Sequence, residues 1–130
     1  MGELRLPSVP ESVPQVRAFV HEQLAQVLDD DALYDVLVAT TEAAGNAVNH
    51  GGLGEQGTIT TSCDALKDKV IITIKDEGRG FEPAQIESAM PDAMSTGGRG
   101  LVLVQALMDS LKIASGPRGT LLTMERAITG

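Results

Sequence analysis

Two strand-like segments joined by a tight turn constrain the fold of this chain more than any other feature. Residues 57–66 (GTITTSCDAL) and 69–78 (KVIITIKDEG) are rich in β-branched side chains, and the stretch KDK lies at their junction. So short a connection favours antiparallel pairing, because a parallel crossover needs a dozen residues or more. The sequence therefore predicts a β-hairpin in the middle of the chain.

Two helices are expected before this hairpin. Residues 10–28 (PESVPQVRAFVHEQLAQVL) repeat apolar side chains along one face, with Ser12 as a candidate N-cap and Pro14 in the first turn. The acidic run at 29–31 interrupts this pattern and can cap the next helix. That second helix is expected over 32–49, and the glycines that follow it supply a stop.

The remaining segments complete an α+β pattern. An irregular stretch, 81–98, contains two prolines and the run STGG, and a third helix follows in the sequence GLVLVQALMDS. Short strands are expected at ELRLPS near the N-terminus, at 111–115 and at 119–127. We therefore predict a two-layer α/β sandwich, with three main helices on one face of a mixed, mainly antiparallel sheet. We expect residues 1–130 to form one domain.

The composition is that of a folded protein with an acidic surface. Of the 130 residues 42% are hydrophobic and 22% charged, and the net charge is −8. This charge disfavours direct binding to nucleic acid or to an anionic membrane. It suits a basic protein partner, although it is equally well explained as a solubility feature.

Cys63 is the only cysteine, so no internal disulfide can form, and its strand-like surroundings favour a place in the core. No apolar run approaches the roughly 20 residues of a membrane span, and the N-terminus lacks the pattern of a signal peptide. We therefore expect a cytoplasmic protein.

A polar stripe runs along the second predicted helix. Glu42, Asn46 and His50 lie four residues apart, so they share one side of the helix at intervals of about 6 Å. Asn46 offers a neutral oxygen of the kind that Mg²⁺ accepts, and Glu42 could deprotonate a nucleophile. Taken alone, the stripe is more often a polar helix edge with solvated side chains.

Two glycine-containing motifs follow. In DEGRGF, Asp76 ends a β-branched strand, and Gly78 and Gly80 allow a ligand to approach the backbone closely. A carboxylate here could accept a hydrogen bond from the amino group of adenine, or the motif could be a simple turn. In STGGRGL, a glycine-rich loop containing Arg99 opens a helix, as in many anion sites.

The order of these motifs resembles the GHKL ATP-binding superfamily, and within it the bacterial serine/threonine kinases that act as anti-sigma factors. The resemblance extends from LRLPSVPESVPQVRAFV to GTLLTMER, nearly the whole chain. It implies the GHKL (Bergerat) ATPase fold, ATP or ADP with Mg²⁺ as cofactors, and a lid at about residues 82–97. The implied partners are a sigma factor and a STAS-type anti-sigma-factor antagonist, and a homodimer is also compatible with it.

The resemblance also implies roles for individual residues. Glu42 would be the catalytic base and Asn46 the Mg²⁺ ligand. Asn46 would also belong to the nucleotide-binding site. The further residues of this site would be His50, Asp76, Gly78, Gly80, Gly98, Arg99, Gly100, Leu101 and Thr120. Among these, Asp76 would bind the adenine amino group with support from Thr120.

One departure from the family pattern leaves a second function open. Some kinases of this type carry an arginine in the lid, and the equivalent position here is Thr96, with Arg99 nearby. Phosphoryl transfer relies on positioning and charge stabilisation, so a missing cation affects transfer more than nucleotide binding. The expected function is a serine/threonine kinase and anti-sigma factor, and the alternative is a non-catalytic nucleotide-binding switch.

Overall fold

A computed structural model describes residues 2–51, 57–77, 99–116 and 119–128 of the chain. Within these residues the chain forms one five-stranded sheet in the order β1-β2-β3-β5-β4, and every neighbouring pair is antiparallel. The strands are β1 (Gly2–Pro7), β2 (Thr58–Ala65), β3 (Lys69–Glu77), β4 (Ser110–Gly116) and β5 (Gly119–Ala127). The expected two-layer α+β architecture is confirmed, and the described sheet is antiparallel throughout.

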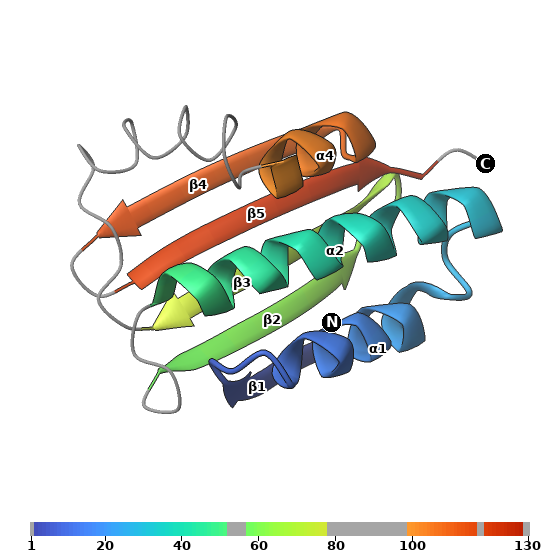
Figure 1. Cartoon of the computed structure of the whole chain (residues 1–130). Helices are drawn as coiled ribbons and strands as arrows, with labels where there is room; N and C mark the ends of the chain where they lie inside the picture. The colour runs from blue at the N-terminus through green and yellow to red at the C-terminus, as the bar shows by residue number, and fades with distance from the viewer. Residues whose placement is uncertain (1, 52–56, 78–98, 117–118, 129–130) are drawn as a thin grey trace.

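Three helices of the described part cover one face of this sheet (Figure 1). They are α1 (Ser12–Leu24), α2 (Asp30–Gly51) and α4 (Arg99–Leu107). The central helix α2 packs against α1 on one side and α4 on the other, and it also contacts β3 and β5. It therefore occupies the middle of the helical layer, directly above the strands that carry the candidate site.

The core lies between the helices and the sheet, and it is almost entirely aliphatic. Inward-facing positions alternate along β2 and β3, which is why their sequences show a period of two. The largest fully buried apolar side chains are Leu24, Ile59, Ile72, Ile74, Met124, Val16, Val20, Val36, Val70 and Val104. Cys63 belongs to the same core, as expected, and burial raises the pKa of its thiol to about 11.

The structure corrects the expected start and end of the first helix. Ser12 is not an N-cap, because it is already helical and its buried hydroxyl donates to the carbonyl oxygen of Pro7. Residue Glu11 precedes the helix without a capping side-chain hydrogen bond. The helix also ends at Leu24, earlier than expected, although Leu28 beyond it still packs in the core.

The expected cap between the first two helices is confirmed. The Asp29 carboxylate accepts a hydrogen bond of 2.8 Å from the backbone N–H of Ala32. The helix α2 is longer than expected at both ends, since it begins at Asp30 and includes Gly51. None of the helices in the described part is both long enough and apolar enough to cross a membrane.

Candidate functional site

The C-terminal half of α2 carries the polar stripe expected from the sequence. Glu42 and Asn46 are both partly exposed residues of this helix, one turn apart. The amide nitrogen Nδ2 of Asn46 is nevertheless buried, and it has no hydrogen-bond partner among the described residues. An unpaired buried amide N–H group costs free energy until a hydrogen-bond acceptor binds it.

Asp76 occupies an apolar position near the end of β3. It continues the inward-facing series of Val70, Ile72 and Ile74, and it is only 3% exposed. Its Oδ1 atom is buried and unpaired among the residues that the structure describes. Desolvation by burial raises the pKa of this carboxyl group above its ordinary value. A donor such as an amino group would relieve this cost by binding Oδ1.

The neighbouring strand places Thr120 opposite Asp76. The two residues are paired across the antiparallel ladder of β3 and β5, so their side chains lie on the same face of the sheet. This juxtaposition depends on pairing between segments more than forty residues apart in the sequence. The cooperation of the two side chains in adenine recognition remains a prediction.

Gly119 is a residue whose role the sequence analysis missed. Its φ is +147°, in the region that favours glycine, and a Cβ placed there would lie 2.9 Å from the carbonyl carbon of Asp76 and closer still to the oxygen. Only glycine therefore permits the backbones of β5 and β3 to approach as they do beside Asp76. The dipeptide Gly119–Thr120 after a turn was the available signal.

The helix α4 begins with Arg99 and Gly100 and continues with Leu101, which packs partly buried against the core. The first N–H groups of a helix lack intrahelical partners and carry a partial positive charge. This end of α4 is therefore suited to anionic groups. The helix packs against α2, so the N-terminus of α4 belongs to a helix that neighbours the one with the polar stripe.

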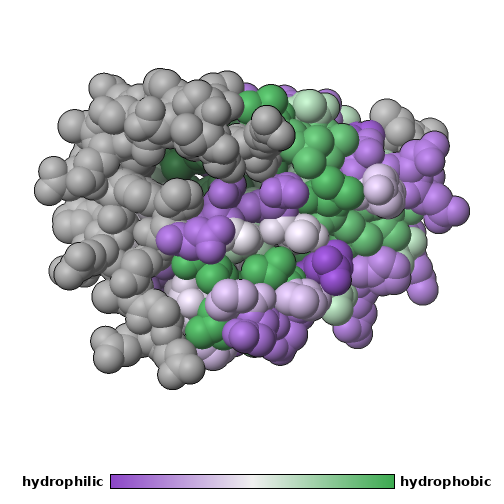
Figure 2. Space-filling model, in the orientation of Figure 1, coloured by the Kyte–Doolittle hydropathy of each residue, from purple (hydrophilic) through white to green (hydrophobic). Residues whose placement is uncertain are grey.

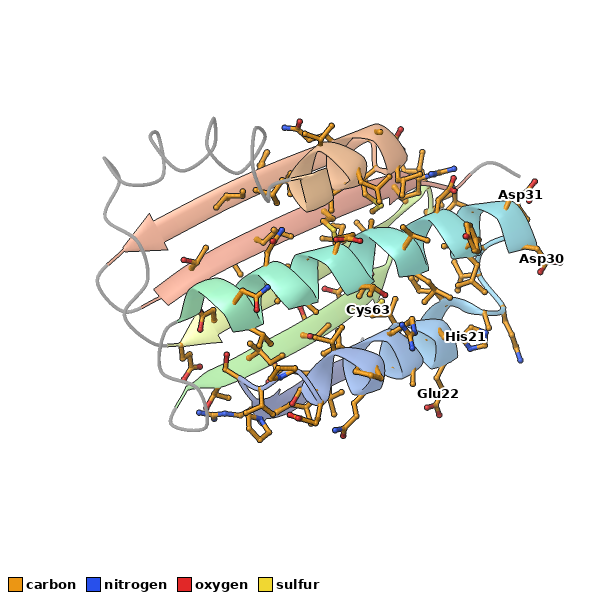
Figure 3. The ribbon with its side chains drawn as sticks, viewed as in Figure 1. His21, Glu22, Asp30, Asp31 and Cys63 are labelled. Atoms are coloured by element: carbon orange, nitrogen blue, oxygen red, sulfur yellow. The ribbon has the colours of Figure 1, made fainter. Side chains whose placement is uncertain are left out.

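Figure 1 shows how these elements meet. The C-terminal end of α2, the end of β3 and the start of β5 lie at the same end of the molecule. Figure 3 shows Asp30 and Asp31 at the opposite end of α2, so these acidic side chains lie away from the candidate site. The fold thus brings Asn46, Asp76 and Thr120 to one end of the two-layer structure.

Several expected site residues lie outside the described residues or at their borders. Gly78, Gly80 and Gly98 lie outside the described residues, as do Thr96 and the segment 82–97. His50 is the penultimate residue of α2, and Arg99 and Gly100 are the first two of α4. Their roles in nucleotide binding remain predictions.

The donor set indicates how a cation could be held. Within the described residues, no group of three His, Cys, Asp or Glu side chains is positioned to bind a metal ion. A cation bound here would take an oxygen from Asn46 and its other ligands from water and phosphate. That combination is typical of Mg²⁺ with a nucleotide, so the Asn46 oxygen fits a cation that is carried by a nucleotide.

Comparison with known proteins shows which family this chain resembles. Residues 6–126 match the family model described as the histidine kinase-like ATPase domain. The chain is 29% identical over 140 residues to the serine-protein kinase RsbW of Bacillus velezensis, covering 98% of this chain and 86% of that protein. It is 32% identical over 137 residues to the anti-sigma F factor of Caldanaerobacter subterraneus, covering 98% and 94%.

Solved structures agree on the fold. The crystal structure of the RsbU and RsbW domains of Rv1364c from Mycobacterium tuberculosis superposes with a TM-score of 0.71 at 24% identity, covering 98% of this chain. This chain spans 33% of that larger protein. The catalytic domain of the histidine kinase ThkA gives a TM-score of 0.63 at 14% identity.

Proposed function

The chain belongs to the histidine kinase-like ATPase domain family, and we propose that it is an ATP- and Mg²⁺-dependent serine/threonine-protein kinase that acts as an anti-sigma factor. The observation that carries this proposal is the identity of about 30% with serine-protein kinases and anti-sigma factors along nearly the whole chain. Residues 1–130 form one ATP-binding domain in this proposal, with the lid at about 82–97.

Adenine recognition falls to Asp76 and Thr120. The unpaired Oδ1 of Asp76 accepts the exocyclic amino group of adenine, and Thr120 on the paired strand supports this contact. Burial strengthens the hydrogen bond, because no water competes for the carboxylate. The desolvation that raises the pKa of Asp76 in the free chain is therefore offset when the nucleotide binds.

Asn46 is assigned to the cation and the start of α4 to the phosphates. When bound, Mg²⁺ neutralises charge that develops on the phosphate oxygens during transfer. The side-chain oxygen of Asn46 supplies a neutral ligand, so it holds the cation without reducing its charge. Free N–H groups in the first turn of α4, with Arg99 and Gly100, face the negative charge of the phosphates.

Glu42 is the catalytic base of the proposed reaction. The serine Oγ of the substrate forms a bond to the γ-phosphorus of ATP, while the bond from that phosphorus to the β,γ-bridging oxygen breaks and ADP leaves with the electron pair. The hydroxyl proton passes to the Glu42 carboxylate. One helical turn separates Glu42 from Asn46, so the base and the cation ligand lie on the same helix side.

The partners of the proposed kinase are proteins. Its substrate is a STAS-type anti-sigma-factor antagonist, and its second partner is a sigma factor that it sequesters in the cytoplasm. The net charge of −8 suits a basic patch on one of these proteins and opposes direct binding to nucleic acid.

Transfer of labelled phosphate tests the proposal. The chain is incubated with labelled ATP, Mg²⁺ and a purified STAS-type antagonist, and phosphoserine is measured in the antagonist. Glu42→Gln should lower the transfer rate by about a hundredfold, the usual effect of losing a general base. Glu22→Gln is the matched control, because Glu22 is an exposed glutamate of α1. Absence of transfer by the unmodified chain, or normal transfer by Glu42→Gln, would exclude the kinase mechanism.

Thr96 at the position of the lid arginine favours one alternative, a nucleotide-binding switch without transfer. Calorimetry distinguishes the two functions when it is combined with the transfer assay. Both require Mg²⁺-dependent ATP binding that Asn46→Ala weakens, whereas the exposed Asn49→Ala on the same helix should not change it. Binding without transfer would support the switch, and no binding would exclude both.

A further inference from the structure

An arginine near the end of β5 joins three elements of the described structure. The Nη1 atom of Arg126 donates a hydrogen bond of 3.0 Å to Oδ2 of Asp35 in α2, and the two side chains also form an ion pair. The same nitrogen donates to the carbonyl oxygen of Leu107, the last residue of α4. Both charged side chains are partly buried, so salt and water weaken their attraction less than at an exposed pair. Arg126 therefore connects β5 with α2 and with α4.

The residue that soon follows α4 ties the same end of this helix to β5. The N–H of Asp109 donates a 2.8 Å hydrogen bond to the carbonyl oxygen of Glu125, and its carboxylate accepts one from the N–H of Ala127. These contacts lie on either side of Arg126 along the strand. The last carbonyl groups of a helix lack intrahelical partners and carry a partial negative charge, so a cation there stabilises the helix end. Directional polar contacts thus fix the C-terminal end of α4 to β5.

Apolar packing holds the body of α4. Val104 of this helix and Met108 just after it are buried in the core, and Figure 2 shows hydrophobic surface over α4 and along its border with α2. Apolar contacts are non-directional, so they oppose separation of two helices more than they oppose sliding or tilting. The hydrogen bonds of Arg126, in contrast, favour one placement of α4, because they need a short distance and a near-linear angle.

The anchored end of α4 lies opposite the end that is assigned to the phosphates. Figure 1 shows α4 running in the opposite direction to α2, with its N-terminus toward the end of the molecule that carries the candidate site. The first and last residues of α4, Arg99 and Leu107, are about 12 Å apart along the helix axis. A tilt of about 5° around Leu107 therefore moves the N-terminus by about 1 Å. A misplacement of about 1 Å can lower the rate of a positioned reaction by about a hundredfold.

Asp35 lies on the same side of α2 as the residues assigned to the chemistry. Glu42 follows it by seven residues and Asn46 by eleven, which are close to two and three full turns of a helix. On α2, Arg126 thus contacts the stripe that continues to the proposed base and cation ligand. On α4, it contacts the helix whose other end is assigned to the phosphates. A single side chain spans the two helices of the proposed transfer site.

We propose that Arg126 is a positioning residue for phosphoryl transfer. It holds α4 on α2 so that phosphates at the N-terminus of α4 lie beside Asn46 and within reach of Glu42. The inference rests on the proposed kinase function, because the separation that Arg126 sets is between groups of that reaction. Arg126 acts through the two helices and touches neither the nucleotide nor the protein substrate. Loss of its side chain should therefore disturb the phosphate contacts and leave adenine recognition intact.

Affinities for ATP and for adenosine separate a positioning role from a general loss of stability. Both are measured with Mg²⁺ present, ATP by calorimetry and adenosine by NMR titration, under conditions in which circular dichroism shows each variant to be folded. Arg126→Met should weaken ATP binding by about fivefold or more, because charge-assisted phosphate contacts are lost. Adenosine affinity should stay within about twofold, since adenine is assigned to Asp76 on the sheet. Partial unfolding would instead lower both affinities by the same factor.

Transfer kinetics give a second readout. With a purified STAS-type antagonist, the kcat of Arg126→Met at saturating ATP and antagonist should fall by about tenfold or more. The KM for the antagonist should stay within about twofold, because the contacts of the antagonist are unchanged. Asp35→Ala should act in the same direction, and it carries the test if Arg126→Met does not fold. The double variant should be no slower than Arg126→Met alone, since both substitutions remove the same contact.

Two further variants serve as controls. Lys69→Met removes an ion pair of 2.9 Å with Glu125, the neighbour of Arg126 on β5. Successive side chains of a strand point to opposite faces, so this pair lies on the other face of the sheet and should not change the ratio of ATP to adenosine affinity. Arg126→Lys is the conservative variant. Because both hydrogen bonds start from one nitrogen, a lysine ammonium can make both, and ATP affinity and kcat should stay within about threefold.

Each outcome decides the positioning role. Equal losses of ATP and adenosine affinity in Arg126→Met, or no loss of either, overturn it, and so does the same selective loss in Lys69→Met. A lysine variant as impaired as Arg126→Met overturns it as well. If the unmodified chain binds ATP but transfers no phosphate, the kinase function fails, whereas a selective loss of ATP affinity still supports the placement of α4 by Arg126. If transfer proceeds and Arg126→Met keeps its kcat, the kinase function stands and the positioning role is overturned. Absence of ATP binding by the unmodified chain overturns both.

Discussion

Substitution of Gly119 by alanine should damage the nucleotide site without unfolding the protein. A Cβ at this position would lie 2.9 Å from the carbonyl carbon of Asp76 and 3.3 Å from the Cα of Glu77. The Asp76 carbonyl oxygen would be nearer still, whereas Cβ atoms essentially never approach other heavy atoms within 3.0 Å. The obstacle is backbone, so it cannot rotate away, and the end of β3 must move.

The size of the effect follows from two contributions. A non-glycine residue held at φ +147° costs about 1–3 kcal/mol of backbone strain. Relief of the contact also displaces the Asp76 backbone from Thr120, its partner across the ladder. Since each 1.4 kcal/mol changes affinity about tenfold, ATP binding should weaken by about tenfold or more. The free energy of unfolding should fall by about 1–3 kcal/mol.

Calorimetric ATP titration and urea unfolding together test this reasoning. Gly45→Ala is the matched control, because no atom lies within 4 Å of a Cβ placed at that helical position. Alanine there should raise the free energy of unfolding by about 0.5–1 kcal/mol and leave ATP affinity unchanged. If Gly119→Ala binds ATP as tightly as the unmodified chain, the close approach of β5 to Asp76 is not what shapes the site.

Three further substitutions or treatments test individual features. Because burial raises the pKa of Asp76, the folded chain binds this proton more tightly than the unfolded chain. The contribution of Asp76 to the free energy of unfolding should therefore decline as pH rises from about 4, the ordinary carboxyl value, through the raised pKa. Asp76→Asn should abolish this decline, raise stability at neutral pH by about 1–3 kcal/mol and weaken ATP binding; equal pH profiles of urea unfolding would contradict this. The Cys63 thiol, with its pKa raised to about 11, should stay unreactive toward a chromogenic disulfide at pH 8 until urea is added, and fast labelling of the folded chain would show that it is accessible. Arg126→Met should lower the free energy of unfolding by about 1–3 kcal/mol, because it removes the 3.0 Å ion pair with Asp35 and the hydrogen bond to the carbonyl oxygen of Leu107. An unchanged urea midpoint would show that these contacts of β5 with α2 and α4 do not stabilise the fold.

The parts of the fold that depend on local sequence were predictable. Runs rich in β-branched side chains identified β2 and β3, and the structure has them at Thr58–Ala65 and Lys69–Glu77. The turn between them closes as expected, with the N–H of Leu66 donating to the carbonyl oxygen of Lys69. The Asp29 cap was equally local, because a side chain that bonds an N–H three residues ahead needs no tertiary contact.

Features that depend on distant contacts were not predictable from spacing. Ser12 has the residue type of an N-cap, but the nearby end of β1 offers its hydroxyl the carbonyl oxygen of Pro7 instead. The strand order places β5 between β3 and β4, and this order alone sets Thr120 opposite Asp76. Motif order suggested that these residues act together through a family resemblance, whereas local physical chemistry contained no such information. The close contact of Gly119 with the Asp76 backbone also arises from the pairing of β5 with β3.

Burial of unpaired polar atoms does not by itself identify the site. The described core also contains the hydroxyls of Ser8, Thr40 and Thr61 without a hydrogen-bond partner. A hydroxyl is a small neutral group, whereas an unpaired carboxylate is the most costly polar group to bury. What distinguishes Asp76 and Asn46 is therefore their chemistry together with their position, at the end where α2, β3 and β5 meet. A nucleotide that satisfies both groups should stabilise the fold as it binds, so the free chain retains a cost that ATP removes.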